Sequence, residues 1–146
     1  MFRRIAGLSV VTFAALFPSC SSSKSTDNGL DAMFGNYGLI SINAIAVPVT
    51  VSLIGTKKVE ITGSRLTLSA SGSFSNSTDY RTTENGQVTT KTETCGGNFL
   101  IHDTTISFSE VVTSGTTCGS RYPGVWNGLN TIAIDFDPTT HAVFVK

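Results

Sequence analysis

The sequence predicts an all-β fold, a single small antiparallel meander barrel of about eight to ten strands, with a β-sandwich as the alternative. Runs of alternating apolar and polar residues recur from residue 34 to residue 146, and β-branched and aromatic residues dominate them. Turns rich in Gly, Asn, Asp and Ser separate these runs at spacings of about 8 to 12 residues. Because closure into a barrel removes exposed strand edges, we favour the barrel over the sandwich.

The first half of the domain contains several runs of strand character. The first run is apolar on both faces and breaks at Pro48, which marks a sheet edge or a corner because proline has no N–H to donate. Ser71-Gly72 turns the chain between the last two of these runs, which predicts a hairpin. The predicted strands cover residues 37–47, 49–53, 59–61, 66–68 and 73–83.

The second half is organised around Asn85-Gly86, the strongest turn signal in the chain. This pair joins residues 80–83 to residues 88–94, and both segments are polar on both faces. Because a packed core does not require such a hairpin, we expect residues 78–94 either to project beyond the barrel as a contact surface or to border a wet lumen. Further predicted strands cover residues 98–101, 104–112, 129–136 and 142–145.

The N-terminal residues have the layout of a secretory signal. Two arginines, Arg3 and Arg4, precede a 13-residue apolar stretch, residues 5–17, and a polar run follows Cys20. The apolar stretch is too short to cross a hydrocarbon core of about 30 Å as a helix. We therefore divide the chain into a signal peptide of the lipoprotein type (1–19), a flexible tether (20–33) and a β-barrel domain (34–146).

The end of this leader, Leu16-Phe17-Pro18-Ser19-Cys20, resembles the lipobox of bacterial lipoproteins, in which a small residue precedes the cysteine that is lipidated. The resemblance implies that Cys20 becomes the mature N-terminus and carries acyl chains such as palmitate. Several chains on one cysteine anchor a protein firmly. We expect lipid anchoring in the cell envelope, at the periplasmic face of a bacterial membrane and in particular the outer membrane. The alternative is secretion after cleavage at Ser19-Cys20-Ser21.

The two later cysteines, Cys95 and Cys118, form an even pair once Cys20 is assigned to the lipid. In an oxidising compartment the default for such a pair is a disulfide, which stabilises by about 3 kcal/mol in the chain-entropy model. The alternative, a metal site, lacks further ligands, because the histidines His102 and His141 have no Cys or His at metal-ligand spacing. We therefore predict a disulfide and no metal.

The charge balance argues against a nucleic-acid partner. The chain has ten basic and ten acidic residues, and Arg3 and Arg4 lie in the leader, so residues 21–146 carry 8 − 10, or −2. Phosphate binding needs clustered Lys or Arg, and the only adjacent basic pair after the leader is Lys57-Lys58. No motif predicts a bound cofactor.

The sequence does not predict an enzyme. It has no Gly-x-Ser-x-Gly elbow, and His102 and Asp103 would point to opposite faces of a strand unless a turn redirects them. Asp135 and Asp137 would share a face of the last hairpin, but two carboxylates fall short of the six or more oxygens that calcium takes.

Three segments resemble small lipocalin-like bacterial lipoproteins. Residues 34–43 carry the Gly-x-aromatic-x-Leu pattern that starts such barrels, and residues 66–74 are similar to their second hairpin. The terminal run Val143-Phe144-Val145-Lys146 looks like their closing strand. The resemblance spans residues 34–146 and implies an up-and-down barrel.

Two functional hypotheses follow. In the first, the anchored barrel binds a small apolar or amphipathic ligand in a lumen of about 300 Å³ or more, lined by Phe74, Phe108 and Trp126. In the second, the chain is a structural or protein-interaction lipoprotein with a filled barrel, and its function lies on residues 78–94 or in the Cys95 to Cys118 region. The expected partners are the membrane, reached through the lipid, and either a lipophilic ligand or another envelope protein.

Overall fold

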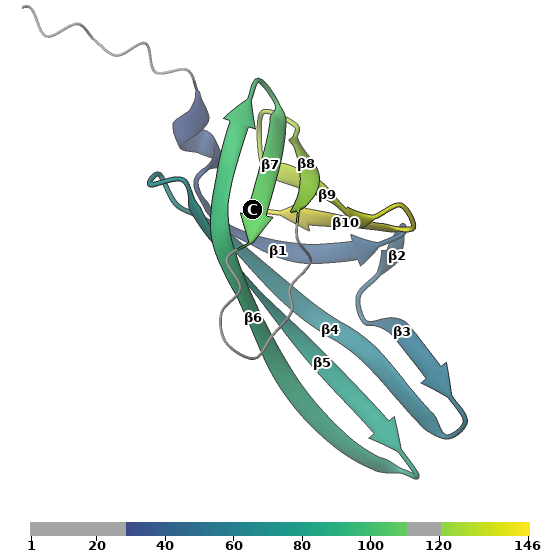
Figure 1. The fold of residues 1–146 in the computed structure, drawn as a ribbon. Helices are drawn as coiled ribbons and strands as arrows, with labels where there is room; N and C mark the ends of the chain where they lie inside the picture. The colour runs from purple at the N-terminus through teal and green to yellow at the C-terminus, as the bar shows by residue number, and fades with distance from the viewer. Residues whose placement is uncertain (1–28, 111–120) are drawn as a thin grey trace, which may run out of the picture.

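The computed structural model describes residues 29–110 and 121–146, and it confirms an all-β meander barrel (Figure 1). Every strand pairs antiparallel with its neighbours. The elements are η1 (Leu30–Met33), β1 (Gly35–Ile42), β2 (Ile45–Ala46), β3 (Val49–Ile54), β4 (Lys57–Leu68), β5 (Ser73–Glu84), β6 (Gln87–His102), β7 (Thr105–Glu110), β8 (Arg121–Trp126), β9 (Thr131–Asp137) and β10 (Thr140–Val145).

The barrel closes through β1, which pairs with β10 on one side and with β4 on the other. Gly38 marks the closure, because it lies opposite Val145 of β10 and opposite Arg65 of β4. Strands β4 to β10 follow one another in the order of the chain, so the eight strands β1 and β4–β10 form the wall.

The short helix η1 lies at the end of the barrel where β1 begins (Figure 1). Met33, its last residue, and Tyr37 of β1 are fully buried, and the Tyr37 hydroxyl donates a hydrogen bond of 2.5 Å to the Met33 carbonyl. Burial raises the pKa of this hydroxyl. Because the antiparallel strands reverse direction at each turn, the β4–β5, β6–β7 and β8–β9 connections lie at this same end.

At the other end the sheet continues beyond the barrel as an arm. Strands β4 and β5 have 12 residues each and β6 has 16, whereas β8 to β10 have six or seven. Past the closure, β3 replaces β1 as the neighbour of β4. We define the arm as β3 together with residues 57–61 of β4, 80–84 of β5 and 87–91 of β6, and Figure 1 shows it extending away from the η1 end.

Apolar side chains line the described interior of the barrel. Alternate residues of each strand point inward, as in β9, where Ile132 and Ile134 are buried and Asp135 is exposed. Phe136, predicted on the same face as these isoleucines, is half-buried against the core. The largest fully buried side chains are Tyr37, Phe108, Phe144, Met33, Leu66, Leu68, Ile106, Ile132 and Ile134.

The predicted first strand, residues 37–47, is wrong in its length. The chain turns at Asn43 and Ala44, which have φ values of 50° and 64°, and β2 folds back on β1. The pattern concealed this turn because both neighbouring segments are apolar and neither turn residue is glycine. Pro48 follows β2 and precedes β3, the two strands at the ends of the sheet order, which agrees with its predicted place at an edge or a corner.

Two pairs of predicted strands are merged in the structure. Residues 59–61 and 66–68 both belong to β4. Residues 88–94 and 98–101 belong to one strand, β6, which continues through Gly96 and Gly97. A Cβ on Gly96 would lie 3.0 Å from the Phe74 carbonyl oxygen, so a close approach of two strands, and not a turn, explains this glycine. Strand β8 was not predicted at all, because Pro123 and Gly124 interrupt its pattern.

Candidate functional site

The three predicted pocket residues lie in the barrel interior and pack among other aromatic rings. Phe74 of β5 and Phe108 of β7 meet edge to face, with ring centroids 5.0 Å apart. Phe108 also stacks on Tyr122 of β8 at 5.3 Å. Gly124 makes room for this cluster, since a Cβ there would lie 2.9 Å from Cε2 of Phe108. Both phenylalanines therefore lie in the interior where the ligand hypothesis places them, and each packs against a neighbouring aromatic ring.

Trp126, the third predicted pocket residue, ends β8 close to the η1 end of the barrel. Its side chain is 6% exposed. The indole Nε1 is buried and has no hydrogen-bond acceptor among the described residues. A buried donor without an acceptor costs about 1–3 kcal/mol. Among the described residues, this is the one buried side-chain nitrogen or oxygen atom without a hydrogen-bond partner, and an oxygen atom of a bound molecule would supply one.

The cysteine predictions fall mainly outside the described residues. Cys20 and Cys118 both lie outside the described residues, so lipidation of Cys20 and the Cys95–Cys118 disulfide stay predictions. Cys95 itself is half-buried on β6, opposite Asn76 of β5. It lies where the long strands leave the barrel, which is the region that the interaction hypothesis singled out.

The His102 and Asp103 pair lies at the β6–β7 turn. Asp103 has a φ of 57°, and the turn brings its Oδ2 to 3.3 Å from Nδ1 of His102. Their side chains are 93% and 87% exposed, so water surrounds both groups. This exposure is typical of a solvated turn and gives no enclosed place for a substrate.

Residues 78–94, singled out as polar on both faces, straddle the junction of barrel and arm. On the inner face, Phe74, opposite Leu68, is followed by Asn76 and Thr78. Oγ of Ser64 lies 2.8 Å from Oδ1 of Asn76 and 2.9 Å from Oγ1 of Thr78. The inward face thus changes from apolar to hydrogen-bonded polar where the strands leave the barrel. The expectation that part of this hairpin projects beyond the barrel is consistent with the arm.

The arm is held together by a buried carboxylate that the sequence pattern did not reveal. Glu60 of β4 is 6% exposed and lies opposite Arg81 of β5. Its Oε1 is 3.0 Å from Nζ of Lys58, and its Oε2 is 3.0 Å from Nε and 2.9 Å from Nη2 of Arg81. The hydrogen bond from Lys58, together with that from Arg81, holds the pKa of Glu60 below its ordinary value despite burial.

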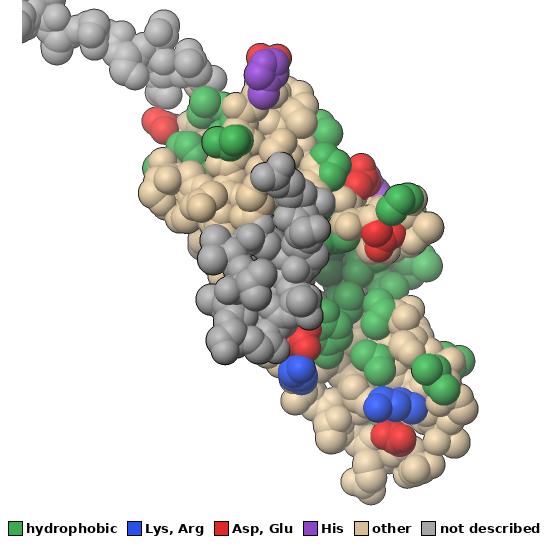
Figure 2. Space-filling view, viewed as in Figure 1, with side chains coloured by type: hydrophobic (Ala, Val, Ile, Leu, Met, Phe, Trp, Pro, Cys, Tyr) green, Lys and Arg blue, Asp and Glu red, His purple; other side chains and the backbone are tan. Residues whose placement is uncertain are grey.

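Exposed apolar side chains gather on the arm. Figure 2 shows hydrophobic side chains clustered where Figure 1 places β2, β3 and β4. On β3, Val51, Leu53 and Ile54 are 48%, 69% and 74% exposed, and Val88 near the β5–β6 turn is 59% exposed. These side chains make the arm a candidate contact surface.

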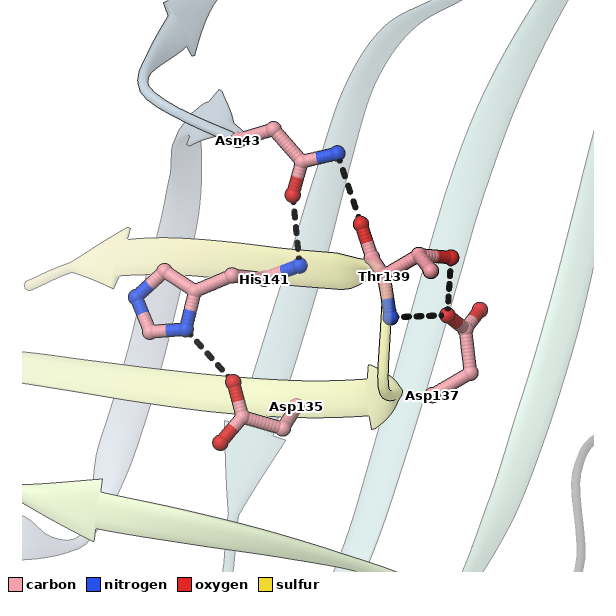
Figure 3. Close-up of polar contacts among 5 residues, drawn as sticks. All are labelled: Asn43, Asp135, Asp137, Thr139 and His141. Carbon is pink, nitrogen blue, oxygen red and sulfur yellow. Dashed lines mark hydrogen bonds and ion pairs between the residues drawn. The ribbon is translucent and has the colours of Figure 1, made fainter.

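A second candidate site is an open pocket of about 710 Å³ beside the β9–β10 turn, on the outside of the barrel. Nδ1 of His141 lies 2.6 Å from Oδ1 of Asp135, and Asn43 joins the β1–β2 turn to the same hairpin (Figure 3). Asp137 accepts hydrogen bonds from both the backbone and the hydroxyl of Thr139. These bonds to Thr139, with that from the Thr140 hydroxyl, lower the pKa of Asp137.

The polar side chains of this pocket are largely engaged in hydrogen bonds with one another, which limits the chemistry that they can carry out. Asp135 orients the His141 ring through Nδ1 (Figure 3), and no hydrogen bond joins Nε2 to another described residue. Thr139 Oγ1 donates to Asp137 and not to the imidazole. Asp135 and Asp137 therefore serve separate partners, and the described residues contain no group of three or more His, Cys, Asp or Glu side chains placed to hold a metal ion. The arrangement chiefly ties two turns together.

No helix in the described part of the chain has the length and apolar character needed to span a membrane. No protein-family model, curated protein or solved structure matches the chain. The function is therefore argued from the chain's own residues.

Proposed function

We propose that this chain is an envelope lipoprotein, anchored through Cys20, whose filled barrel is a scaffold and whose arm binds another envelope protein. The observation that carries the proposal is the arm itself, which extends β4, β5 and β6 beyond the barrel and bears exposed apolar side chains. Exposed apolar side chains that gather in one region support a contact with a partner.

The position of η1, the first described element, supports this proposal. Nine residues, Ser21 to Gly29, separate Cys20 from η1, and fully extended they span about 30 Å. Because η1 lies at the barrel end opposite the arm, an anchor at Cys20 holds the η1 end near the membrane and leaves the arm reaching away from it. The arm is then placed to contact a protein rather than the lipid surface of its own anchor.

Photo-crosslinking in intact envelopes tests the proposal. A photoreactive residue replaces Val88 on the arm, and the matched control replaces Leu129, which is 72% exposed in the β8–β9 turn near η1. We expect a covalent adduct to another protein from position 88 and none from position 129. An adduct from position 129 alone, or from neither position, would overturn the proposal.

The second candidate function is retention of a small amphipathic ligand in the barrel. One observation favours it, the buried Nε1 of Trp126, which an oxygen atom of such a ligand would satisfy. The packing of Phe74 against Phe108 weighs against it, since a ligand must displace those rings. A small molecule that co-purifies with the protein and is lost in a Trp126→Phe variant would support this second function.

A further inference from the structure

Strand β3 presents an open sheet edge. Among the described strands it has a single neighbour, β4, so its other edge carries backbone N–H and C=O groups without a strand to pair with. Its sequence, Val49 to Ile54, contains no charged residue, and its last residues are among the most exposed apolar side chains of the arm. Proteins commonly blunt such an edge with lysine or proline inside the strand, and β3 has neither.

The hairpin geometry shows which groups face outward. Gly55, with a φ of 57°, and Thr56 form a two-residue turn between Ile54 and Lys57, which lie opposite each other. In such a hairpin the residues that flank the turn exchange both hydrogen bonds. The next residue, Leu53, therefore directs its N–H and C=O away from β4. A bulge between Thr50 and Ser52 confines the regular edge to residues 52–54.

The charges beside this edge select its partner. The arm carries four cations, Lys57, Lys58, Arg81 and Lys91, and two carboxylates, Glu60 and Glu84, so its net charge is 4 − 2, or +2. The side chains of Lys57 and Lys58 are 50% and 42% exposed. The ion pair between Lys57 and Glu84 is the longest in the arm, with 4.0 Å between Nζ and Oε2. An apolar strand with a carboxylate just beyond its end complements this arrangement.

A second copy of the chain fits less well. If the β3 edges of two copies paired antiparallel, the first residues of β3 in one copy, and the residues before them, would lie beside Lys57 and Lys58 of the other copy. Residues 43–56 contain no carboxylate, so self-pairing would add no negative charge to offset the net positive charge of the arm. The charge pattern therefore favours a different protein.

We infer that the outer edge of β3 binds an extended, mainly apolar segment of another envelope protein as an added strand, with an acidic residue of that segment beside Lys57 and Lys58. The inference rests on the proposed function and names the partner's chemistry. Main-chain hydrogen bonds at Leu53 supply affinity, and Val51, Leu53 and Ile54 supply apolar contacts.

The test uses the full chain in its own envelope, with the photoreactive residue at Val51 and, separately, at Val88. Leu53→Pro removes the outward N–H, and Leu53→Ala is the matched control because it keeps that N–H. Lys57→Glu reverses one charge beside the edge, and Lys58 stays unchanged because its Nζ binds the buried carboxylate of Glu60. We expect Leu53→Pro and the charge reversal each to lower the yield of the position 51 adduct about tenfold, and Leu53→Ala to lower it less.

The outcomes separate the two proposals. If neither position gives a protein adduct, the proposed function fails. If position 88 gives an adduct that none of the variants lowers, the arm binds a partner but the β3 inference is wrong. An adduct with the mass of two copies of this chain also overturns the inference. Should Leu53→Pro unfold the arm, as judged by circular dichroism, the charge-reversed variant alone decides.

Discussion

Glu60 and Arg81 lie opposite each other on β4 and β5, and the guanidinium contacts one carboxylate oxygen through both Nε and Nη2. Lys58 takes the other oxygen. The carboxylate is buried and both cations are partly exposed, so one acid residue joins two strands of the arm at a point beyond the barrel's closure. The arm thus has a polar cross-link of its own in addition to the apolar contacts of Val49 and Ile61 with the core.

Glu60→Gln will lower the thermal stability of the protein by several degrees at neutral pH, because two cations lose their counter-ion. The matched control is Glu84→Gln, since the Glu84 side chain is 53% exposed and 4.0 Å from Lys57, and exposed pairs contribute little. The pKa of Glu60 is lowered in the folded protein, so its contribution is present above the ordinary value of 4.5 and is lost as the pH falls through the lower folded value.

The difference between the wild type and Glu60→Gln should therefore shrink as the pH is lowered below about 4.5, which thermal melts followed by circular dichroism will show. A gap in melting temperature that is equally large at pH 7 and in strong acid, or a Glu84→Gln variant as unstable as Glu60→Gln, would contradict this account.

Tyr37→Phe will destabilise the protein by about 1–2 kcal/mol, because the Met33 carbonyl loses a buried donor. Equilibrium urea unfolding measures the change. Hydrogen exchange should also show faster exchange in residues 30–34 with little effect on β9 and β10, since the lost bond holds η1 to the barrel end. Equal loss of protection in all strands would indicate that the hydroxyl does not hold η1.

Asn43→Ala will cost about 2 kcal/mol, because Asn43 donates to the Thr139 carbonyl and accepts from the His141 N–H. The control, Ala44→Gly, lies in the same turn and should raise stability by about 1 kcal/mol, since alanine at a φ of 64° is strained and glycine is not. Chemical denaturation of both variants measures the two changes in the free energy of unfolding. A stabilising Asn43→Ala, or a destabilising Ala44→Gly, would show that the turn is built differently.

Gly124→Ala will destabilise the barrel by about 1–3 kcal/mol, because the new methyl group would lie 2.9 Å from Phe108 and 3.2 Å from the Ala133 carbonyl oxygen. Gly38→Ala is the control, since its nearest contact, at 3.9 Å, is ordinary. Thermal melts compare the two. If both substitutions are tolerated equally, the interior around Phe108 has room that a filled barrel does not have.

The sequence was sufficient to predict the fold class because alternation and turn chemistry are local signals. Asn85 and Gly86 have φ values of 49° and 78°, as the hairpin that they predicted requires. Closure of the barrel through β1 and β4 joins residues about thirty positions apart, and no local pattern encodes it. The arm was predicted only in part, as a hairpin polar on both sides. The run Val59-Glu60-Ile61 gives no indication that the Glu60 carboxylate is buried.

The candidate site was less predictable for the same reason. Asp135 and His141 come together because a bulge between Thr140 and His141 shifts the register of β9 and β10, and such a shift is invisible in the sequence. The pair that was considered, His102 and Asp103, does meet, but in solvent. Phe74, Phe108 and Trp126 are buried, as aromatic side chains on the apolar face of a strand usually are, and their predicted role as a ligand pocket stays a prediction.

Native mass spectrometry of the protein released from its own envelope tests the central claim most directly, because it weighs the anchor, any ligand and any partner in one measurement. The account predicts a chain that begins at Cys20 with acyl chains attached and that retains no small molecule in the barrel. It also predicts that a fraction of the chains is bound to a second protein. A chain without lipid, or one that retains a small apolar molecule and no protein, would contradict it.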